Sequence, residues 1–161
     1  MNVNIGFMQG RLTDIVDNKI QSFPWSNWRN EFNLAKKHDF NLMEWTLDYE
    51  NLHENPLMTK VGQLEIQKLS KKYDIKIFSL TGDCFMQAPF WKSAENQFNL
   101  ENEFILVTEA CSRLGINIIV VPLVDEGSVE NEIQEKKILE FFLSKVNFFK
   151  KNNIRIAFET D

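Results

Sequence analysis

The sequence has few of the residues that build covalent staples, phosphate loops or zinc sites. It contains two cysteines, six glycines and two histidines in 161 residues. Cys84 and Cys111 make neither a disulfide framework nor a CxxC pair, which favours a reducing compartment, and we expect a cytoplasmic location. The glycines match no phosphate-binding motif. Neither His38 nor His53 directly follows a predicted strand, so no multi-histidine zinc site is expected.

Excess positive charge and long apolar runs are also missing. The net charge is −5 and the pI is near 5.2, which argues against a nucleic-acid partner because such proteins need a basic surface. No apolar run is long enough to span a membrane, and the N-terminus lacks the features of a signal peptide. With 43% hydrophobic and 25% charged residues, we expect a single domain, 1–161, that buries its own core.

Short apolar runs rich in β-branched residues recur roughly every 35 to 40 residues, as strands in repeated units do. The run that begins at Ile116 is almost continuously apolar, as expected of a strand covered on both faces. The predicted strands are residues 3–8, 41–47, 75–80, 116–124 and 154–158.

Helical periodicity separates these runs. Apolar residues spaced by three and four predict amphipathic helices around residues 28–35, 61–73, 100–114 and 139–149. Ser26, Thr59 and Ser128 are candidate N-caps. The residues at the helix ends that tolerate the left-handed conformation are His38 and Asp39, Asp74, Gly115, and Asn152 and Asn153.

The alternation of strands and helices predicts an α/β fold with a parallel sheet and right-handed crossovers. Because the last predicted strand ends near residue 158, we expect five parallel strands with four intervening helices, a partial (βα)8 TIM barrel cut after strand five. A flavodoxin-like open sheet is the alternative, but it needs a helix to cover its last strand.

Ligands of parallel α/β folds bind at the carboxyl ends of the strands, and acidic residues follow four of the five predicted strands. Such a rim suits a divalent cation or acid–base chemistry on hydroxyl groups. Glu44 stands in an apolar strand, so a site role and a satisfied structural role both remain open. The same holds for Asp48 and Asp125, which could simply form caps or turns. Arg11 could bind a phosphate or carboxylate, or form a surface ion pair.

The long loop after the third predicted strand carries three aromatic residues, Phe85, Phe90 and Trp91. Such a group could form one wall of a sugar site, or it could be a hydrophobic plug beneath the loop. Cys84, in the same loop, has no base partner nearby in sequence, and we interpret it as a buried thiol.

Five segments in order resemble the strand ends of xylose isomerase-like TIM barrels, and within them the sugar phosphate isomerase/epimerase group. They are residues 4–12 (NIGFMQGRL), 42–45 (LMEW), 79–83 (SLTGD), 120–123 (VVPL) and 156–159 (IAFE). The resemblance covers the whole chain but only five of the family's eight units. It implies a small-molecule partner, a sugar or sugar phosphate, with no nucleic acid and no membrane.

The resemblance also implies residue roles. Glu159 matches the family's glutamate at the end of strand five, a metal ligand that also moves a proton in ketose epimerases. The implied substrate-side residues are Gln9, Arg11, Glu44 and Trp45, and we add Asp83, Phe85 and Trp91 from their position. A divalent metal (Mn, Mg, Co or Zn) is expected for a complete barrel, whereas this chain alone has one implied ligand and could hold none.

Three functional hypotheses follow. The first is the N-terminal part of a metal-assisted sugar isomerase or epimerase, and the second is a catalytically inactive fragment or sugar-binding module of the same fold. The third, a relative of the apurinic endonucleases, is disfavoured because it needs many histidines and a basic face. We also predict self-association through the exposed edges of the sheet.

Overall fold

A computed structural model describes residues 4–15, 19 and 21–160, and its sheet contains five parallel strands in chain order. Every neighbouring pair is parallel, so the prediction of five parallel strands is confirmed. The strands are β1 (Gly6–Met8), β2 (Leu42–Thr46), β3 (Lys76–Thr81), β4 (Ile118–Pro122) and β5 (Arg155–Glu159). The strand predicted over residues 3–8 begins only at Gly6, and Val3 lies outside the described residues.

In the described part of the chain, six helices and three short 3₁₀ turns lie between the strands. The helices are α1 (Trp28–Lys37), α2 (Lys60–Tyr73), α3 (Asp83–Gln87), α4 (Gln97–Leu114), α5 (Glu132–Ser144) and α6 (Val146–Lys151). The turns are η1 (Leu52–Glu54), η2 (Pro56–Met58) and η3 (Asp125–Gly127). The four predicted helices are present, but the last is divided into α5 and α6, and the short α3 was not expected.

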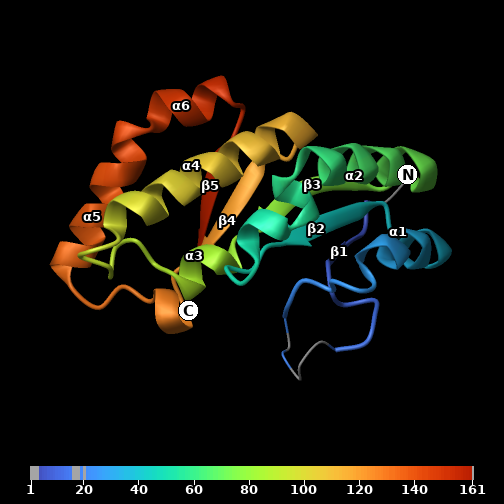
Figure 1. Ribbon diagram of the computed structural model, residues 1–161, viewed down its shortest axis with the longest axis horizontal. Helices are drawn as coiled ribbons and strands as arrows, with labels where there is room; N and C mark the ends of the chain where they lie inside the picture. Colours follow the sequence, from blue (N-terminus) through green and yellow to red (C-terminus); the bar gives the residue numbers. More distant parts are fainter. Residues whose placement is uncertain (1–3, 16–18, 20, 161) are drawn as a thin grey trace.

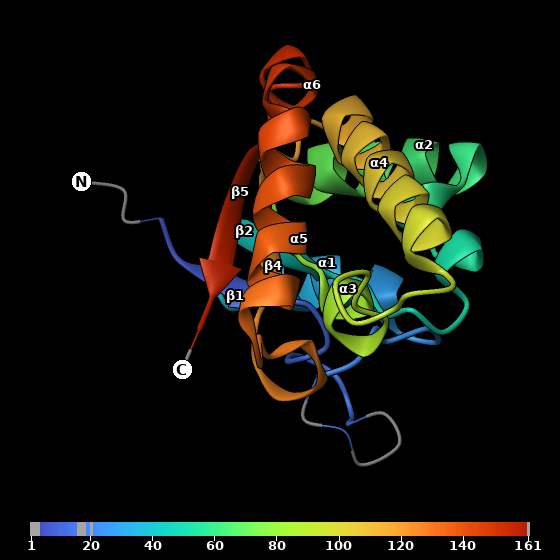
Figure 2. The ribbon, with the colours of Figure 1, turned by 90° about the vertical axis from the view of Figure 1, so that its left-hand side faces the viewer.

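The helices lie on one side of the sheet, so the described part of the chain leaves the other side uncovered (Figure 2). A doubly wound flavodoxin-like sheet has helices on both faces and a non-consecutive strand order. The consecutive order observed here is instead that of an unclosed TIM barrel. The loops that follow the strands, together with α3, lie at the carboxyl ends of the strands, on the same side as the C-terminus (Figure 1).

The core lies between the sheet and the helices and is rich in aromatic rings. Trp45 on β2 is fully buried and meets Trp28 of α1 edge-on, with ring centroids 5.8 Å apart. Phe104 of α4 stacks on Phe85 of α3 at 4.2 Å and meets Phe141 of α5 at 5.4 Å. These contacts fix the helices against the strands and thereby set the positions of the loops at the strand ends.

The helix ends test the predicted caps. Thr59 accepts a hydrogen bond from the Gly62 amide, which confirms it as the N-cap of α2. The predictions for Ser26 and Ser128 are wrong. Asn27 precedes α1 without a side-chain cap, and Asn131 caps α5 by accepting from the Gln134 amide at 3.1 Å. A side chain can cap only from the residue next to the first turn, and both serines precede that position.

The predicted left-handed residues are confirmed in part. Asp39, Asp74, Gly115 and Asn153 have positive φ, whereas His38 (φ −103°) and Asn152 (φ −87°) do not. None of the helices in the described part of the chain is long and apolar enough to cross a membrane.

Candidate functional site

Glu44 projects from β2 toward the uncovered face of the sheet. Its neighbours Met43 and Trp45 are buried on the helix side, and successive side chains on a strand point to opposite faces. The carboxylate of Glu44 accepts hydrogen bonds from the Ser79 hydroxyl at 2.6 Å and the Thr81 hydroxyl at 2.7 Å. Both donors come from β3, so Glu44 is held as a rigid acceptor on the open face.

Glu159 lies on the same face at the carboxyl end of β5. It pairs with Pro122 in the register of β4 and β5. Its neighbour Phe158 lines an apolar groove with Phe142 of α5, so Phe158 points to the helix side. Alternation therefore places Glu159 on the opposite, open face.

The carboxyl group of Asp83 has a strongly raised pKa. Asp83 begins α3 directly after β3 and accepts a hydrogen bond from the Gln21 side chain at 2.7 Å. Burial raises the pKa of Asp83 from 3.8 to about 7; the Gln21 hydrogen bond opposes this, while the negative charges of Asp48, Glu159 and Glu44 add to it. Asp83 is therefore partly protonated near neutral pH, and other acidic side chains lie close to it.

Asp48 fastens the loop after β1 to the loop after β2 and to α3. Its Oδ2 accepts from the Phe23 amide at 2.7 Å and the Ser22 hydroxyl at 3.3 Å. Its Oδ1 accepts from the Gln87 side chain at 2.9 Å. We call the four acids Glu44, Asp48, Asp83 and Glu159 the acidic rim, because all belong to the carboxyl ends of the strands or the residues just beyond them.

Glu31 of α1 holds the first turn of the loop after β1. Its carboxylate accepts from the Gly10 amide at 2.8 and 3.0 Å and from the Leu12 amide at 3.2 Å. Burial raises the pKa of Glu31 from 4.5 to about 7, and the backbone hydrogen bonds act in the opposite direction. Sequence analysis gave no signal for this role, because Glu31 resembles an ordinary first-turn helix acid.

Four of the predicted substrate-side residues are buried. Gln9 continues the sheet beyond β1, since its backbone amide donates to the Glu44 carbonyl at 2.9 Å, and its side-chain oxygen accepts from the Thr46 amide at 3.3 Å. Trp45 donates from Nε1 to Asn55 at 3.2 Å within the core. Phe85 packs on Phe104, and Trp91 is 1% exposed and packs against Phe90. In the structure, all four of these side chains are buried.

Arg11 is exposed and lies apart from the acidic rim. It lines a separate hollow with Asn27 and Asn30 near the start of α1. Of the predicted site residues, the structure therefore brings together Glu44, Asp83 and Glu159. Among the rim's neighbours, Gln21 and Gln87 were not predicted. Gln21 lies in the connection between β1 and α1, and Gln87 is the last residue of α3.

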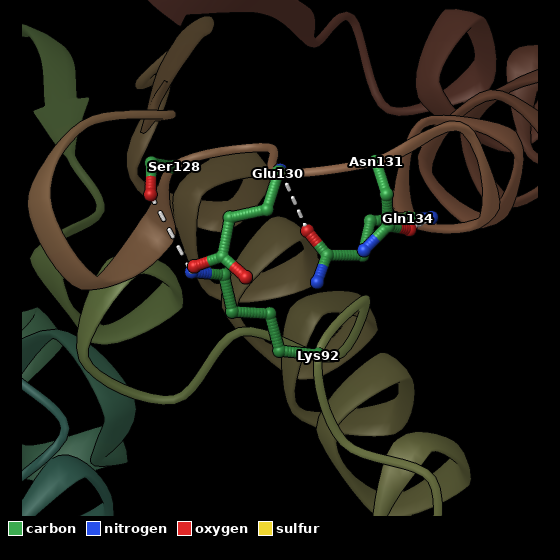
Figure 3. A network of polar contacts seen from close by, with 5 residues as sticks. All are labelled: Lys92, Ser128, Glu130, Asn131 and Gln134. Carbon is green, nitrogen blue, oxygen red and sulfur yellow. Dashed lines mark hydrogen bonds and ion pairs between the residues drawn. The ribbon is translucent and has the colours of Figure 1, made fainter.

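A second polar network joins the loop after α3 to the loop before α5 (Figure 3). Lys92 pairs with Glu130 at 2.6 Å and donates to the Ser128 hydroxyl at 3.4 Å. The Glu130 amide donates to the Gln134 side chain at 2.9 Å. Ser128 thus contributes to a contact between loops instead of capping the helix.

Both cysteines belong to the buried core. Cys84 and Cys111 are buried free thiols, and burial raises the pKa of each above its ordinary value. This confirms Cys84 as a buried thiol. His53 is exposed and pairs with Glu103 at 3.1 Å.

The expected metal does not fit the donors that the structure brings together. Within residues 4–15, 19 and 21–160, no three His, Cys, Asp or Glu side chains are placed to hold a metal ion. Asp48 already accepts hydrogen bonds from three donors. Glu159 is the one acid of the rim for which the resemblance implies a role as metal ligand.

Comparison with solved structures identifies the architecture. The chain superposes on a sugar phosphate isomerase/epimerase from Parabacteroides distasonis with a TM-score of 0.65 and 16% identity, over 98% of this chain and 51% of the other. A D-psicose 3-epimerase from Clostridium cellulolyticum, solved with D-tagatose, gives a TM-score of 0.68 at 10% identity, over 94% and 50%. The fold is that of half a xylose isomerase-like barrel.

A third neighbour, a xylose isomerase domain protein from Salmonella typhimurium, has a TM-score of 0.55 and 16% identity, over 81% of this chain and 43% of the other. No protein-family model and no curated protein sequence matches the chain. The chain therefore spans about half the length of the structures that it resembles. At these identities the likeness establishes the fold, which confirms the resemblance seen in the sequence at that level.

Proposed function

We propose that the acidic rim forms half of the site of a sugar isomerase or epimerase, in which Glu159 moves a proton and Glu44 and Asp83 bind hydroxyl groups. The observation that carries the proposal is the position of Glu159 on the open face, near enough to Asp83 for its charge to raise the Asp83 pKa. The names of the structural neighbours support the substrate class.

The chemistry follows from the acids themselves. Isomerisation and epimerisation both remove a proton from the carbon beside a carbonyl group, and a positioned carboxylate can serve as the base. Asp83, with a pKa of about 7, is available in its protonated form to donate a hydrogen bond to a sugar oxygen. Glu44, held by Ser79 and Thr81, offers a fixed acceptor for a sugar hydroxyl.

The divalent metal implied by the resemblance would need ligands in addition to Glu159. The donors that converge in the described residues do not form such a site, so the roles proposed here are confined to proton transfer and hydroxyl binding. A sugar-binding module without turnover is the second candidate. It is favoured by the lack of converging metal ligands in the described residues. The buried free thiols suit a reducing compartment.

Deuterium exchange separates the two candidates. D-fructose, D-tagatose or D-psicose is incubated with the chain in D₂O, and loss of the proton beside the carbonyl is followed by NMR. We expect exchange that Glu159→Gln slows about 100-fold or more, the usual contribution of a positioned base. Glu140→Gln, an exposed carboxylate on α5, is the matched control and should exchange like the wild type.

Saturable sugar binding with no exchange in either protein would support the sugar-binding module and reject catalysis by this chain. Exchange that is equal in wild type and Glu159→Gln would reject the role of Glu159. Absence of both binding and exchange would reject both candidates.

A further inference from the structure

A cavity of about 610 Å³ lies on the loop side of the acidic rim. Its walls come from the loops after β1 and β2, from α3 and from η3, and they include Ser22, Trp25, Asp48, Asn51, Gln87 and Asp125. The volume is in the range of small-molecule sites, about 300–1,000 Å³. Glu44, Asp83 and Glu159 do not line it, so the cavity is distinct from the proposed catalytic face and meets the rim only at Asp48.

Trp25 gives the cavity an exposed aromatic wall. It is 37% exposed, whereas Trp28, Trp45 and Trp91 are at most 2% exposed. Phe23 meets its ring edge-on, with the centroids 4.9 Å apart, so the indole is held by a fully buried neighbour. A fixed, exposed ring of this kind presents an apolar surface on which the C–H face of a sugar can pack.

The rest of the lining is suited to hydroxyl groups. Asn51 carries an amide, and Glu50, Asp125 and Glu126 carry carboxyl groups, all within the same lining. The Ser22 hydroxyl and the Gln87 amide also line the cavity, but both already donate hydrogen bonds to Asp48. Amides donate and accept hydrogen bonds, and carboxylates accept them, so the set can pair with several sugar hydroxyls at once.

The charge of the lining selects against phosphate. Asp48, Glu50, Asp125 and Glu126 are acidic, and Lys19 is the cation that the described lining contains. A phosphate group would meet several like charges here, which disfavours its binding. Arg11, the group that could bind a phosphate, lines a different hollow.

We propose that this cavity is a second carbohydrate site, which binds an unphosphorylated sugar against Trp25 and excludes the phosphorylated form. The inference does not depend on proton transfer by Glu159, because it concerns binding in a separate cavity.

The indole N–H signals of ¹⁵N-labelled protein test the proposal directly. We titrate D-fructose and, separately, D-fructose 6-phosphate, and assign the Trp25 signal by its loss in Trp25→Phe. We expect D-fructose to shift the Trp25 signal saturably and to bind at least about fivefold more tightly than its phosphate, as expected for repulsion between like charges. Phosphate binding that is equal or tighter would overturn the proposal.

Three variants test whether sugar binding depends on stacking against Trp25 and on the negative charge of Glu126. In the variants, binding is followed through backbone amide signals of the cavity. Trp25→Ala should weaken D-fructose binding about three- to tenfold, and Trp25→Phe should preserve it to within about twofold, because a phenyl ring can still stack. Glu126→Gln should reduce the preference for D-fructose over its phosphate.

The backbone amide spectrum away from the cavity should match the wild type in every variant. Unchanged binding in Trp25→Ala would overturn the stacking role. Glu159→Gln should leave the Trp25 shift intact, and loss of that shift would overturn the separation of the two sites.

Discussion

The side chain of Gln87 donates a hydrogen bond of 2.9 Å to Oδ1 of Asp48, and this contact ties α3 to the end of β2. The other oxygen of Asp48 accepts from the Phe23 amide at 2.7 Å. One buried carboxylate thus joins three segments that are distant in the sequence. Asp48 belongs to the acidic rim and also lines the cavity beside Trp25, so both proposed sites depend on it.

We expect Asp48→Asn to lower the free energy of unfolding by about 1–3 kcal/mol, because the amide NH₂ group would face a donor where the carboxylate accepted. Urea denaturation measures the change. Asp39→Asn is the matched control, since Asp39 is exposed and has a positive φ that asparagine tolerates. Equal stability of the two variants would contradict the role assigned to Asp48.

The raised pKa of Asp83, about 7 against an ordinary 3.8, predicts a dependence of stability on pH. The folded state binds more protons than the unfolded state between about pH 4 and 7, so the free energy of unfolding should fall as the pH rises through this window. Between pH 5 and 8 the contribution of Asp83 should be about 2 kcal/mol. Glu31 acts in the same direction, because its pKa is also raised to about 7.

Asp83→Asn should therefore reduce the loss of stability between pH 5 and 8 by about 2 kcal/mol. The comparison is made by urea denaturation at both pH values, with Asp74→Asn as the control at an exposed residue whose φ of 56° asparagine accepts. A pH dependence that is identical in Asp83→Asn and the wild type would show that Asp83 does not carry this proton.

Gly62 allows α2 to approach the η2 turn closely. A Cβ at this position would lie 2.3 Å from the Pro56 carbonyl oxygen and 2.4 Å from the Pro56 Cα. Alanine in a helix is ordinarily more stable than glycine by about 1 kcal/mol, but here we expect Gly62→Ala to lower the unfolding free energy by about 2 kcal/mol or more. Thermal or urea denaturation measures it.

Gly115→Ala is the matched comparison, because nothing lies within 4 Å of a Cβ there and only its φ of 75° opposes alanine. Its cost should be about 1 kcal/mol. A Gly62→Ala variant that is as stable as the wild type would mean that the helix and the turn can separate.

The strands and helices could be predicted because their signals are local. The apolar run around Ile119 and the stripe from Leu100 to Leu114 predicted β4 and α4 to within a few residues. The break between α5 and α6 was missed because the apolar spacing continues across it. There, the Ser144 hydroxyl donates to the Phe141 carbonyl and competes with the helical hydrogen bonds.

The positions of the candidate site residues could be predicted in part. Glu44 stood out as an acid within an apolar strand and Glu159 through the resemblance, and alternation along β2 and β5 places both on the open face. The resemblance also implied a substrate-side role for Trp45, whose side chain faces the helices because it is next to Glu44. Trp25 and Gln21 were missed because their positions depend on how a long loop folds back, which no local pattern specifies.

Each strand of the sheet pairs only with the strands that precede and follow it in the chain. Its partners are therefore separated by one crossover, and no strand has to wait for a distant segment before it can form its hydrogen bonds. Such a sheet can grow from the N-terminus one unit at a time during synthesis. Glu159 is the final residue of β5, the most C-terminal strand that the structure describes, so the acidic rim acquires this member after Glu44, Asp48 and Asp83.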